Sequence, residues 1–148
     1  THMVANRFWD PHNNYPDGTL KEFKHWSAEI SYRQHTLGSF ILFAKRPLEK
    51  FSDLTIDELA DLTHTMKSIE QALKNAPEFN PDRFNYWQMG NKVHHLHFHG
   101  IPRYQQNRKF QGTVWEDKTW GKPPLWSTGE IDRSLVKVLR DTLAPYVK

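Results

Sequence analysis

The pattern of apolar and polar positions predicts four strands in this chain. One is a continuous apolar run, and the others alternate loosely or are rich in aromatic and β-branched side chains. A turn over residues 35–38 separates the first two, which we therefore expect to pair antiparallel. The predicted strands cover residues 26–32, 40–44, 83–89 and 93–99.

One long segment has helical spacing, with apolar residues recurring at every third or fourth position. Thr55 and Glu58 form a capping-box pattern at its start, and Pro77 stops it. The helix is therefore predicted to run from Thr55 to about Ala76. Its apolar stripe, which should lie on one face of the sheet, consists of Leu59, Leu62, Met66, Ile69 and Leu73.

A second helix is predicted near the C-terminus. It should begin at Ser127, with Glu130 as its capping-box partner, and end at Pro145. These elements together predict an α+β fold, an antiparallel sheet with a long helix on one face and a C-terminal helix. The apolar face of the second helix consists of Ile131, Leu135, Val138, Leu139 and Leu143.

Two segments show neither the helical nor the strand period of apolar residues. Residues 4–25 are polar and aromatic, and we expect their aromatic side chains to pack on the core edge rather than line a base pocket. Residues 105–126 are predicted to be an ordered loop rich in tryptophan, either closing over a site or packing against a second subunit. No linker divides the chain, so residues 4–148 are expected to form one domain, and residues 1–3 are expected to be an expression remnant.

Composition narrows the range of partners. The net charge is +3, from 20 basic and 17 acidic residues, a mild bias that suits a small anionic ligand and not a nucleic acid. The chain has no cysteine, which excludes disulfides, thiolate zinc sites and a cysteine nucleophile. No stretch approaches a membrane span and no leader pattern is seen, so we expect a cytoplasmic protein.

Three histidines at alternate positions are the strongest chemical signal. On a strand, His95, His97 and His99 would share one face, with rings starting roughly 6.6 Å apart. A neutral imidazole is a good nucleophile and a protonated one is a two-donor cation, so such a row suits attack at phosphorus. The same row could instead bind zinc, or the histidines could serve only as hydrogen-bonding strand residues.

The chain resembles the histidine triad (HIT) family, whose signature is HxHxHxx with apolar x. Here the signature reads His95-Leu96-His97-Phe98-His99-Gly100-Ile101, followed by Pro102-Arg103-Tyr104. Residues 39–62 resemble the strand and helix that precede the motif, and residues 85–87 and 90–93 resemble the strand and short glycine turn that lead into it. Phe110-Gln111-Gly112 and residues 120–124 are similar to a bacterial branch of the family.

The resemblance implies a homodimeric nucleotide hydrolase acting at the α-phosphorus of a nucleoside phosphate ester, anhydride or phosphoramidate. By analogy His97 attacks and forms a nucleotidyl-histidine intermediate, His99 contacts the phosphate oxygens, and His95 supports the arrangement. Having His99 rather than glutamine at the third position resembles the hydrolases and not the hexose-phosphate uridylyltransferases. No cofactor is implied, although a divalent metal could accompany the substrate phosphates.

Three further positions are candidates for phosphate or nucleotide binding. The turn at Gly90 exposes backbone N–H groups, and the amide of Asn91 can donate to a phosphate or ribose oxygen. Ser39 occupies the position where many family members carry a further histidine that supports the triad. This departure leaves two alternatives to a hydrolase: a weak enzyme that mainly binds nucleotides, or a protein whose histidine row binds zinc.

Overall fold

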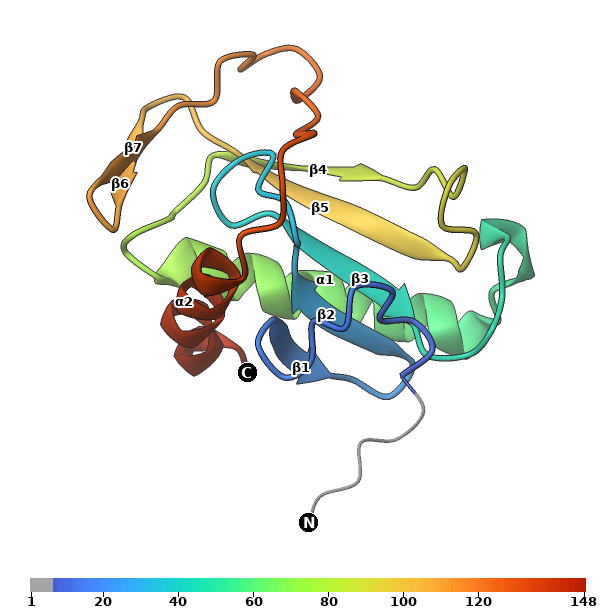
Figure 1. Ribbon diagram of the computed structural model, residues 1–148. Helices are drawn as coiled ribbons and strands as arrows, with labels where there is room; N and C mark the ends of the chain where they lie inside the picture. The colour runs from blue at the N-terminus through green and yellow to red at the C-terminus, as the bar shows by residue number, and fades with distance from the viewer. Residues whose placement is uncertain (1–6) are drawn as a thin grey trace.

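The computed structural model describes residues 7–148, and it confirms the predicted α+β architecture. A five-stranded antiparallel sheet has the order β1-β2-β3-β5-β4 (Figure 1). The predictions for residues 1–6, including the expression remnant, lie outside the described residues. None of the helices among residues 7–148 is both long and apolar enough to cross a membrane. The five strands are β1 (Thr19–Glu22), β2 (Trp26–Ile30), β3 (Phe40–Ala44), β4 (Arg83–Trp87) and β5 (His97–Arg103).

Helix α1 (Ile56–Asn75) covers one face of the sheet. Its start is the predicted capping box: Thr55 Oγ1 accepts from the backbone N–H of Glu58, and the Glu58 carboxylate accepts from that of Thr55. Leu59 was expected on the buried stripe, but it is 40% exposed. The core between helix and sheet, where each buried apolar side chain contributes about 1.5–3 kcal/mol, includes Leu62, Ile69, Leu73, Phe40, Leu42 and Phe98.

Close contact between β3 and β5 depends on the glycine that follows the last histidine of the motif. Gly100 lies opposite Phe40, and a Cβ built on Gly100 would lie only 2.2 Å from two atoms of the Phe40 ring. Any larger residue would push this fully buried ring away from its place in the core. Gly100 therefore serves packing directly beneath the histidine site.

The opposite face of the sheet carries the polar side chains. Register pairs Glu29 with Ile41, Ile41 with His99, and His99 with Trp87, so these side chains lie on one face. Part of this face is covered by the segment before β1, which contributes Trp9 to a small apolar cluster. The rest of the face stays open.

The histidine strand begins later than predicted. Strand β5 starts at His97, whereas the prediction placed its start at Val93. Leu96 donates its N–H to the carbonyl of Leu48 and accepts from the N–H of Ala44, so the chain before His97 follows the segment that leaves β3. Propensity alone could not reveal this competing hydrogen-bond partner.

The C-terminal helix also begins later than predicted. Helix α2 (Arg133–Leu143) is capped by Asp132, whose carboxylate accepts from the N–H of Leu135 at 3.1 Å, so neither Ser127 nor Glu130 starts it. A short 3₁₀ helix, Ala144–Tyr146, follows. Tertiary contacts instead hold residues 126–131 against the open face of the sheet.

Two regions predicted as irregular contain strands. The 105–126 segment forms a hairpin of β6 (Arg108–Phe110) and β7 (Thr113–Trp115), and its two turn residues, Gln111 and Gly112, have φ values of 51° and 77°. Two consecutive positive φ values are typical of a type I′ hairpin turn. Strand β1 lies in the 4–25 segment. The expected aromatic packing of that segment is confirmed for Trp9 and Phe23, whereas Phe8 is 40% exposed.

Candidate functional site

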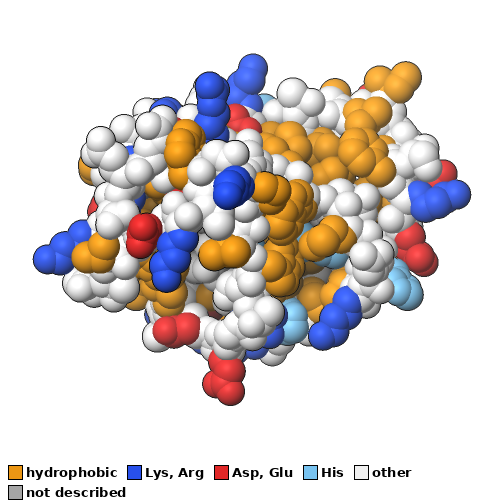
Figure 2. All heavy atoms as spheres, turned by 90° about the horizontal axis from the view of Figure 1, so that it is seen from above, with side chains coloured by type: hydrophobic (Ala, Val, Ile, Leu, Met, Phe, Trp, Pro, Cys, Tyr) orange, Lys and Arg blue, Asp and Glu red, His pale blue; other side chains and the backbone are white. Residues whose placement is uncertain are grey.

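A cleft of about 640 Å³ opens on the polar face of the sheet. His97 and His99 lie in it, together with the predicted Gly90 and Asn91. On the surface seen from above in Figure 2, hydrophobic side chains gather around histidine atoms. The volume falls within the range usual for small-molecule sites. Other residues that line the cleft include Pro11, His12, Tyr32, Arg33, Ile41, Phe43, Trp87, Met89, Lys92 and Trp126.

His97 is held in one tautomer by the backbone. Its Nδ1 lies 2.7 Å from the carbonyl oxygen of His95, and because a carbonyl can only accept, Nδ1 must carry the proton. In the neutral imidazole the lone pair then lies on Nε2, which can act as a nucleophile or ligand. The His97 ring lies against Phe43, with 5.7 Å between ring centroids, and only 7% of the residue is exposed.

His95 does not share a cleft with the other two histidines. Its Nε2 donates to the carbonyl oxygen of Ala44 at 2.6 Å, and its ring meets Phe8 edge-on at 4.9 Å. It lines a separate hollow beside Leu48, and burial lowers its pKa. The expected row of three is therefore wrong, because His95 precedes the strand. The row consists of His97 and His99, whose ring centroids lie 4.9 Å apart.

His99 is a neutral imidazole near pH 7. Burial lowers its pKa to about 3, helped by the nearby His97 and His35. Its Nδ1 is buried and has no hydrogen-bond partner within the described part of the chain. An unpaired buried polar atom costs about 1–3 kcal/mol. The His99 side chain therefore carries a cost in stability at the wall of the cleft.

His35 is a fourth histidine that the sequence reading missed. Its ring lies 6.1 Å from that of His99 and stacks on Trp126 at 4.0 Å. Its Nδ1 accepts from the N–H of Ser127 at 2.9 Å, and burial lowers its pKa to about 4. The one signal for it was its place in the turn four residues before Ser39.

Ser39 itself is not brought into the cleft. Its hydroxyl donates to the carbonyl of Thr36 at 2.8 Å and accepts from the N–H of the same residue at 3.1 Å. The side chain is buried and serves the turn before β3. Gly90 and Asn91, by contrast, do line the cleft, and Gly90 adopts φ 69°, a conformation that favours glycine.

Two cationic residues, Arg33 and Lys92, line the cleft. The pKa of His12 is lowered by burial and then by Arg33, Arg133 and Lys92, while Asp10 opposes them. The local potential is therefore positive, which suits a phosphate-bearing ligand. Sequence gave no signal for this group, because its members come from segments far apart in the chain. No group of three or more potential metal ligands is found among residues 7–148.

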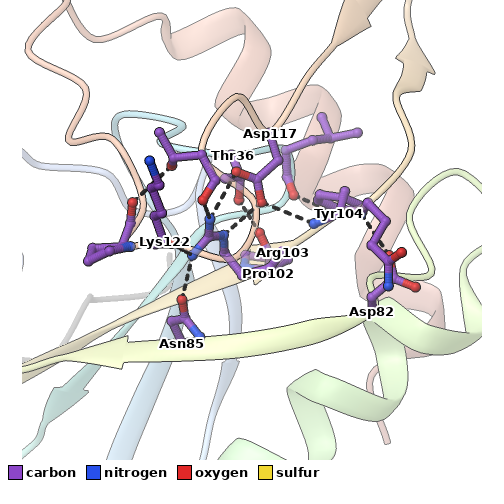
Figure 3. Close-up of polar contacts among 12 residues, drawn as sticks. Thr36, Asp82, Asn85, Pro102, Arg103, Tyr104, Asp117 and Lys122 are labelled. Carbon is purple, nitrogen blue, oxygen red and sulfur yellow. Dashed lines mark hydrogen bonds and ion pairs between the residues drawn. The ribbon is translucent and has the colours of Figure 1, made fainter.

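A buried ion pair fixes the loop that leads toward the cleft. Arg103, at the end of β5, donates to both carboxylate oxygens of Asp117 at 2.7 and 3.1 Å and to the side chain of Asn85 at 2.7 Å (Figure 3). It also donates to the carbonyls of Thr119 and Lys122, both at 2.8 Å. Residues 117–122 are thereby tied to β4 and β5. We call these contacts the Arg103 network.

Fold and site together define an α+β protein with two close histidines on the open face of an antiparallel sheet. The sequence profile of the HIT domain matches residues 17–106. The chain is also 32% identical over 107 residues to the Bacillus subtilis protein named Protein hit, covering 68% of this chain and 71% of that protein. The chain therefore belongs to the HIT family.

Solved structures show the same fold. A histidine triad protein from Sinorhizobium meliloti superposes with a TM-score of 0.67 at 19% identity, over 99% of this chain and 98% of the other. The diadenosine triphosphate hydrolase of Plasmodium falciparum gives a TM-score of 0.63 at 14% identity, over 88% and 76% of the two chains. At these identities the likeness establishes the shared fold.

Proposed function

We propose that this chain is a nucleotide hydrolase that cleaves a nucleoside phosphate ester, anhydride or phosphoramidate at the α-phosphorus. The observation that carries the proposal is the 2.7 Å hydrogen bond from His97 Nδ1 to the carbonyl of His95. It directs the lone pair to Nε2 of a histidine that lines the cleft. Family membership and the hydrolase activity named for the Plasmodium neighbour support the same class of reaction.

In the proposed reaction, His97 Nε2 attacks the α-phosphorus. A P–N bond forms, and the bond to the leaving group breaks with its electron pair on the leaving group. The imidazole now carries a positive charge, and the hydrogen bond from its Nδ1–H to the His95 carbonyl becomes charge-assisted and stronger. Water then attacks phosphorus and gives up one proton to solvent, the P–N bond breaks with its electron pair on Nε2, and a nucleoside monophosphate leaves. Two easier steps replace one.

Other residues would support the phosphate. A neutral His99 has one N–H to donate to a non-bridging oxygen, and Asn91 can donate from its amide. The positive potential from Arg33 and Lys92 favours the charged substrate. His95 acts at a distance, since its own ring is bound to Ala44 while its carbonyl orients His97. It is a positioning residue.

The test is intact-mass spectrometry after rapid quenching of metal-free protein mixed with diadenosine triphosphate or an adenosine phosphoramidate. We expect an acid-labile adenylate adduct on the wild type and none on His97→Ala, with AMP release lowered at least about a thousandfold. His64→Ala is the matched control, because His64 is exposed on α1 and far from the cleft lining. It should form the adduct normally.

Absence of both adduct and AMP release in the wild type, with nucleotide still bound, would refute the hydrolase proposal and leave a nucleotide-binding protein. Stoichiometric zinc in the protein as purified would favour the metal alternative.

The homodimer remains a prediction as well. Strand β4 has no partner on its outer side within residues 7–148, and sedimentation velocity measures the mass directly. The cytoplasmic location is likewise still a prediction.

A further inference from the structure

Residues 7–15, which we call the strap, lie across the open face of the sheet without joining it. In Figure 1 they pass over the sheet, in dark blue, before the chain turns back into β1. The strap contains no helix or strand, so side chains hold it in place. Arg7 and Trp9 both donate to one carboxylate oxygen of Glu29 on β2, at 3.1 and 3.3 Å. The side-chain amide of Asn14 donates to the carbonyl of the last residue of β2 at 3.3 Å.

The interface between the strap and the sheet leaves several polar atoms unpaired. Seven buried side-chain polar atoms have no hydrogen-bond partner within residues 7–148, and four of the seven lie at this interface. Those four are Arg7 Nε, Asn14 Oδ1, Glu29 Oε1 and the hydroxyl oxygen of Tyr32. Each would bond to water if the strap moved away, so its burial opposes docking of the strap. We therefore expect this segment to open more readily than the rest of the fold.

The strap borders the cleft that holds the candidate nucleophile. His12 lines the cleft directly, and Trp9 packs against three residues that line it too. These three are Tyr32, Ile41 and Phe43. The strap also reaches the residue that positions His97, because the ring of Phe8 meets that of His95 edge-on at 4.9 Å. Lifting of the strap would withdraw Trp9 and enlarge the cleft.

We propose that the strap lifts from the sheet as a unit and opens the cleft along β2, and that ionisation of Glu29 favours its release. This conformational device goes beyond the proposed reaction and does not depend on what the cleft binds. Glu29 is the natural latch because it is fully buried and accepts hydrogen bonds from two strap residues, Arg7 and Trp9.

The charges near Glu29 set the direction of the pH dependence. Burial, with the charge of Asp10 adding to it and that of Arg7 opposing it, raises the pKa of Glu29 from 4.5 to about 7. A lifted strap lets water reach the carboxylate, so its pKa should return toward 4.5. The docked state therefore binds more protons, and opening is favoured as pH rises between these values. Other charged or titratable groups nearby are Glu22 on β1, its partner Lys45, Tyr32 and Arg133 on α2.

Cysteine labelling can measure this opening, because the chain has no cysteine of its own. Ser27→Cys places a thiol on the strap side of β2, at a fully buried position whose serine contacts Glu29 at 3.1 Å. Ala28→Cys places one at the next position, equally buried but in the core beneath α1. A thiol reagent should reach the first when the strap lifts, and the second only when helix and sheet separate.

Labelling is measured where the rate is proportional to reagent concentration, so that it reports the open fraction. Each rate is divided by that of the same variant unfolded in urea at the same pH, which removes the titration of the thiol itself. We expect Ser27→Cys to label at least about tenfold faster than Ala28→Cys at pH 8. Its corrected rate should rise about tenfold between pH 6 and pH 8, as expected for a carboxyl whose pKa falls from about 7 to 4.5 on opening.

Adding Glu29→Gln to Ser27→Cys should abolish this rise. Glu22→Gln in the same background is the matched control, because Glu22 also pairs with Arg7, at 2.6 Å, but is partly exposed. The pKa of Glu22 is lowered by its hydrogen bonds to Arg7 and Lys45 in spite of partial burial, so it stays ionised above pH 6 and its loss should leave the tenfold rise in place.

A second readout needs no substitution. The indole N–H of Trp9 donates to Glu29, so its hydrogen exchange in the wild type, followed by NMR and corrected for free tryptophan, should show the same rise with pH. Equal corrected labelling rates for Ser27→Cys and Ala28→Cys would overturn the strap, because its lifting would then require global unfolding. A faster Ser27→Cys whose rise with pH is absent, or survives Glu29→Gln, would overturn the Glu29 latch. Both assays use the protein alone, so none of these outcomes bears on the hydrolase proposal.

Discussion

The two ends of strand β5 carry buried polar side chains that are satisfied to very different degrees. At its C-terminal end, Arg103 makes five hydrogen bonds, which use every donor of a guanidinium. Near its N-terminal end, His99 has a buried Nδ1 without a partner among the described residues. The first arrangement stabilises the fold. The second carries a cost in stability in the side chain next to His97.

Breaking the Arg103 network should have the largest effect on stability. Arg103→Met leaves the Asp117 carboxylate, whose side chain is 2% exposed, without its counter-charge. Removing one partner of a buried pair costs about 3–5 kcal/mol, so we expect a loss of this size in urea unfolding. Arg83→Met is the control. Arg83 is exposed on β4 directly opposite Arg103, and its replacement should change stability by less than about 0.5 kcal/mol.

Equal unfolding free energies for the two variants would contradict this interpretation of the network. The double variant Arg103→Met, Asp117→Leu sharpens it further. Once both charges are gone, no uncompensated buried charge remains, so much of the loss should be recovered. Recovery would show that the single variant is unstable because of the stranded carboxylate and not because of lost packing.

The hydrogen bonding of Glu29 is intermediate between that of Arg103, which is complete, and that of His99. One carboxylate oxygen accepts from Arg7, Trp9 and Ser27 at 3.1–3.3 Å, whereas the other is buried with no partner in the described chain. Burial raises the pKa of Glu29 from 4.5 to about 7, with the charge of Asp10 adding to the effect. The folded state therefore binds more protons than the unfolded state between pH 4.5 and 7, and stability falls as pH rises through that window.

Glu29→Gln should remove this pH dependence. The gap between 4.5 and about 7 corresponds to about 3 kcal/mol. The unfolding free energy of the variant minus that of the wild type should thus grow by about 3 kcal/mol between pH 4.5 and 8. Titrations common to both proteins cancel in this difference. Glu78→Gln, at an exposed position, should follow the wild-type profile, and a Glu29→Gln profile parallel to wild type would refute the argument.

The parts of the molecule that sequence predicted well are those with local causes. The Thr55 capping box lies within four residues, and the 40–44 run is apolar at every position, so neither depends on distant partners. His97 and His99 were found because alternate strand positions share a face. The hairpin at Gln111 was missed because its strands are only three residues each, too short to show a period.

The parts that sequence missed depend on contacts between distant segments. His35 enters the site through Ser127, 92 residues later, and no local pattern marks that pair. The same contact keeps the chain near Ser127 from starting the C-terminal helix. His95 was misplaced for a similar reason, because its ring donates a hydrogen bond to the carbonyl of Ala44. Tertiary hydrogen bonds overrode periodicity in each case.

Replacing His99, near the N-terminal end of β5, should show that this side chain lowers stability and serves function. The folded-state pKa of about 3 lies below the unfolded value of 6.5, so between these values the unfolded state binds more protons. Wild-type stability therefore falls as pH falls below 6.5, and at pH 5 this group costs about 2 kcal/mol relative to pH 8. His99→Leu cannot titrate and fills the site without a buried unpaired nitrogen. Its unfolding free energy should fall by about 2 kcal/mol less than that of wild type between pH 8 and pH 5.

The same variant should lose hydrolysis, because no N–H remains to contact the phosphate oxygens. The matched control is His94→Leu, at an exposed position five residues earlier, which should keep both the wild-type pH profile and the activity. If His99→Leu lost stability on acidification as steeply as wild type, the buried neutral imidazole would not be the source of the effect. A more acid-tolerant but inactive His99→Leu would show that the buried imidazole is retained for its chemistry, as stability–activity trade-offs predict.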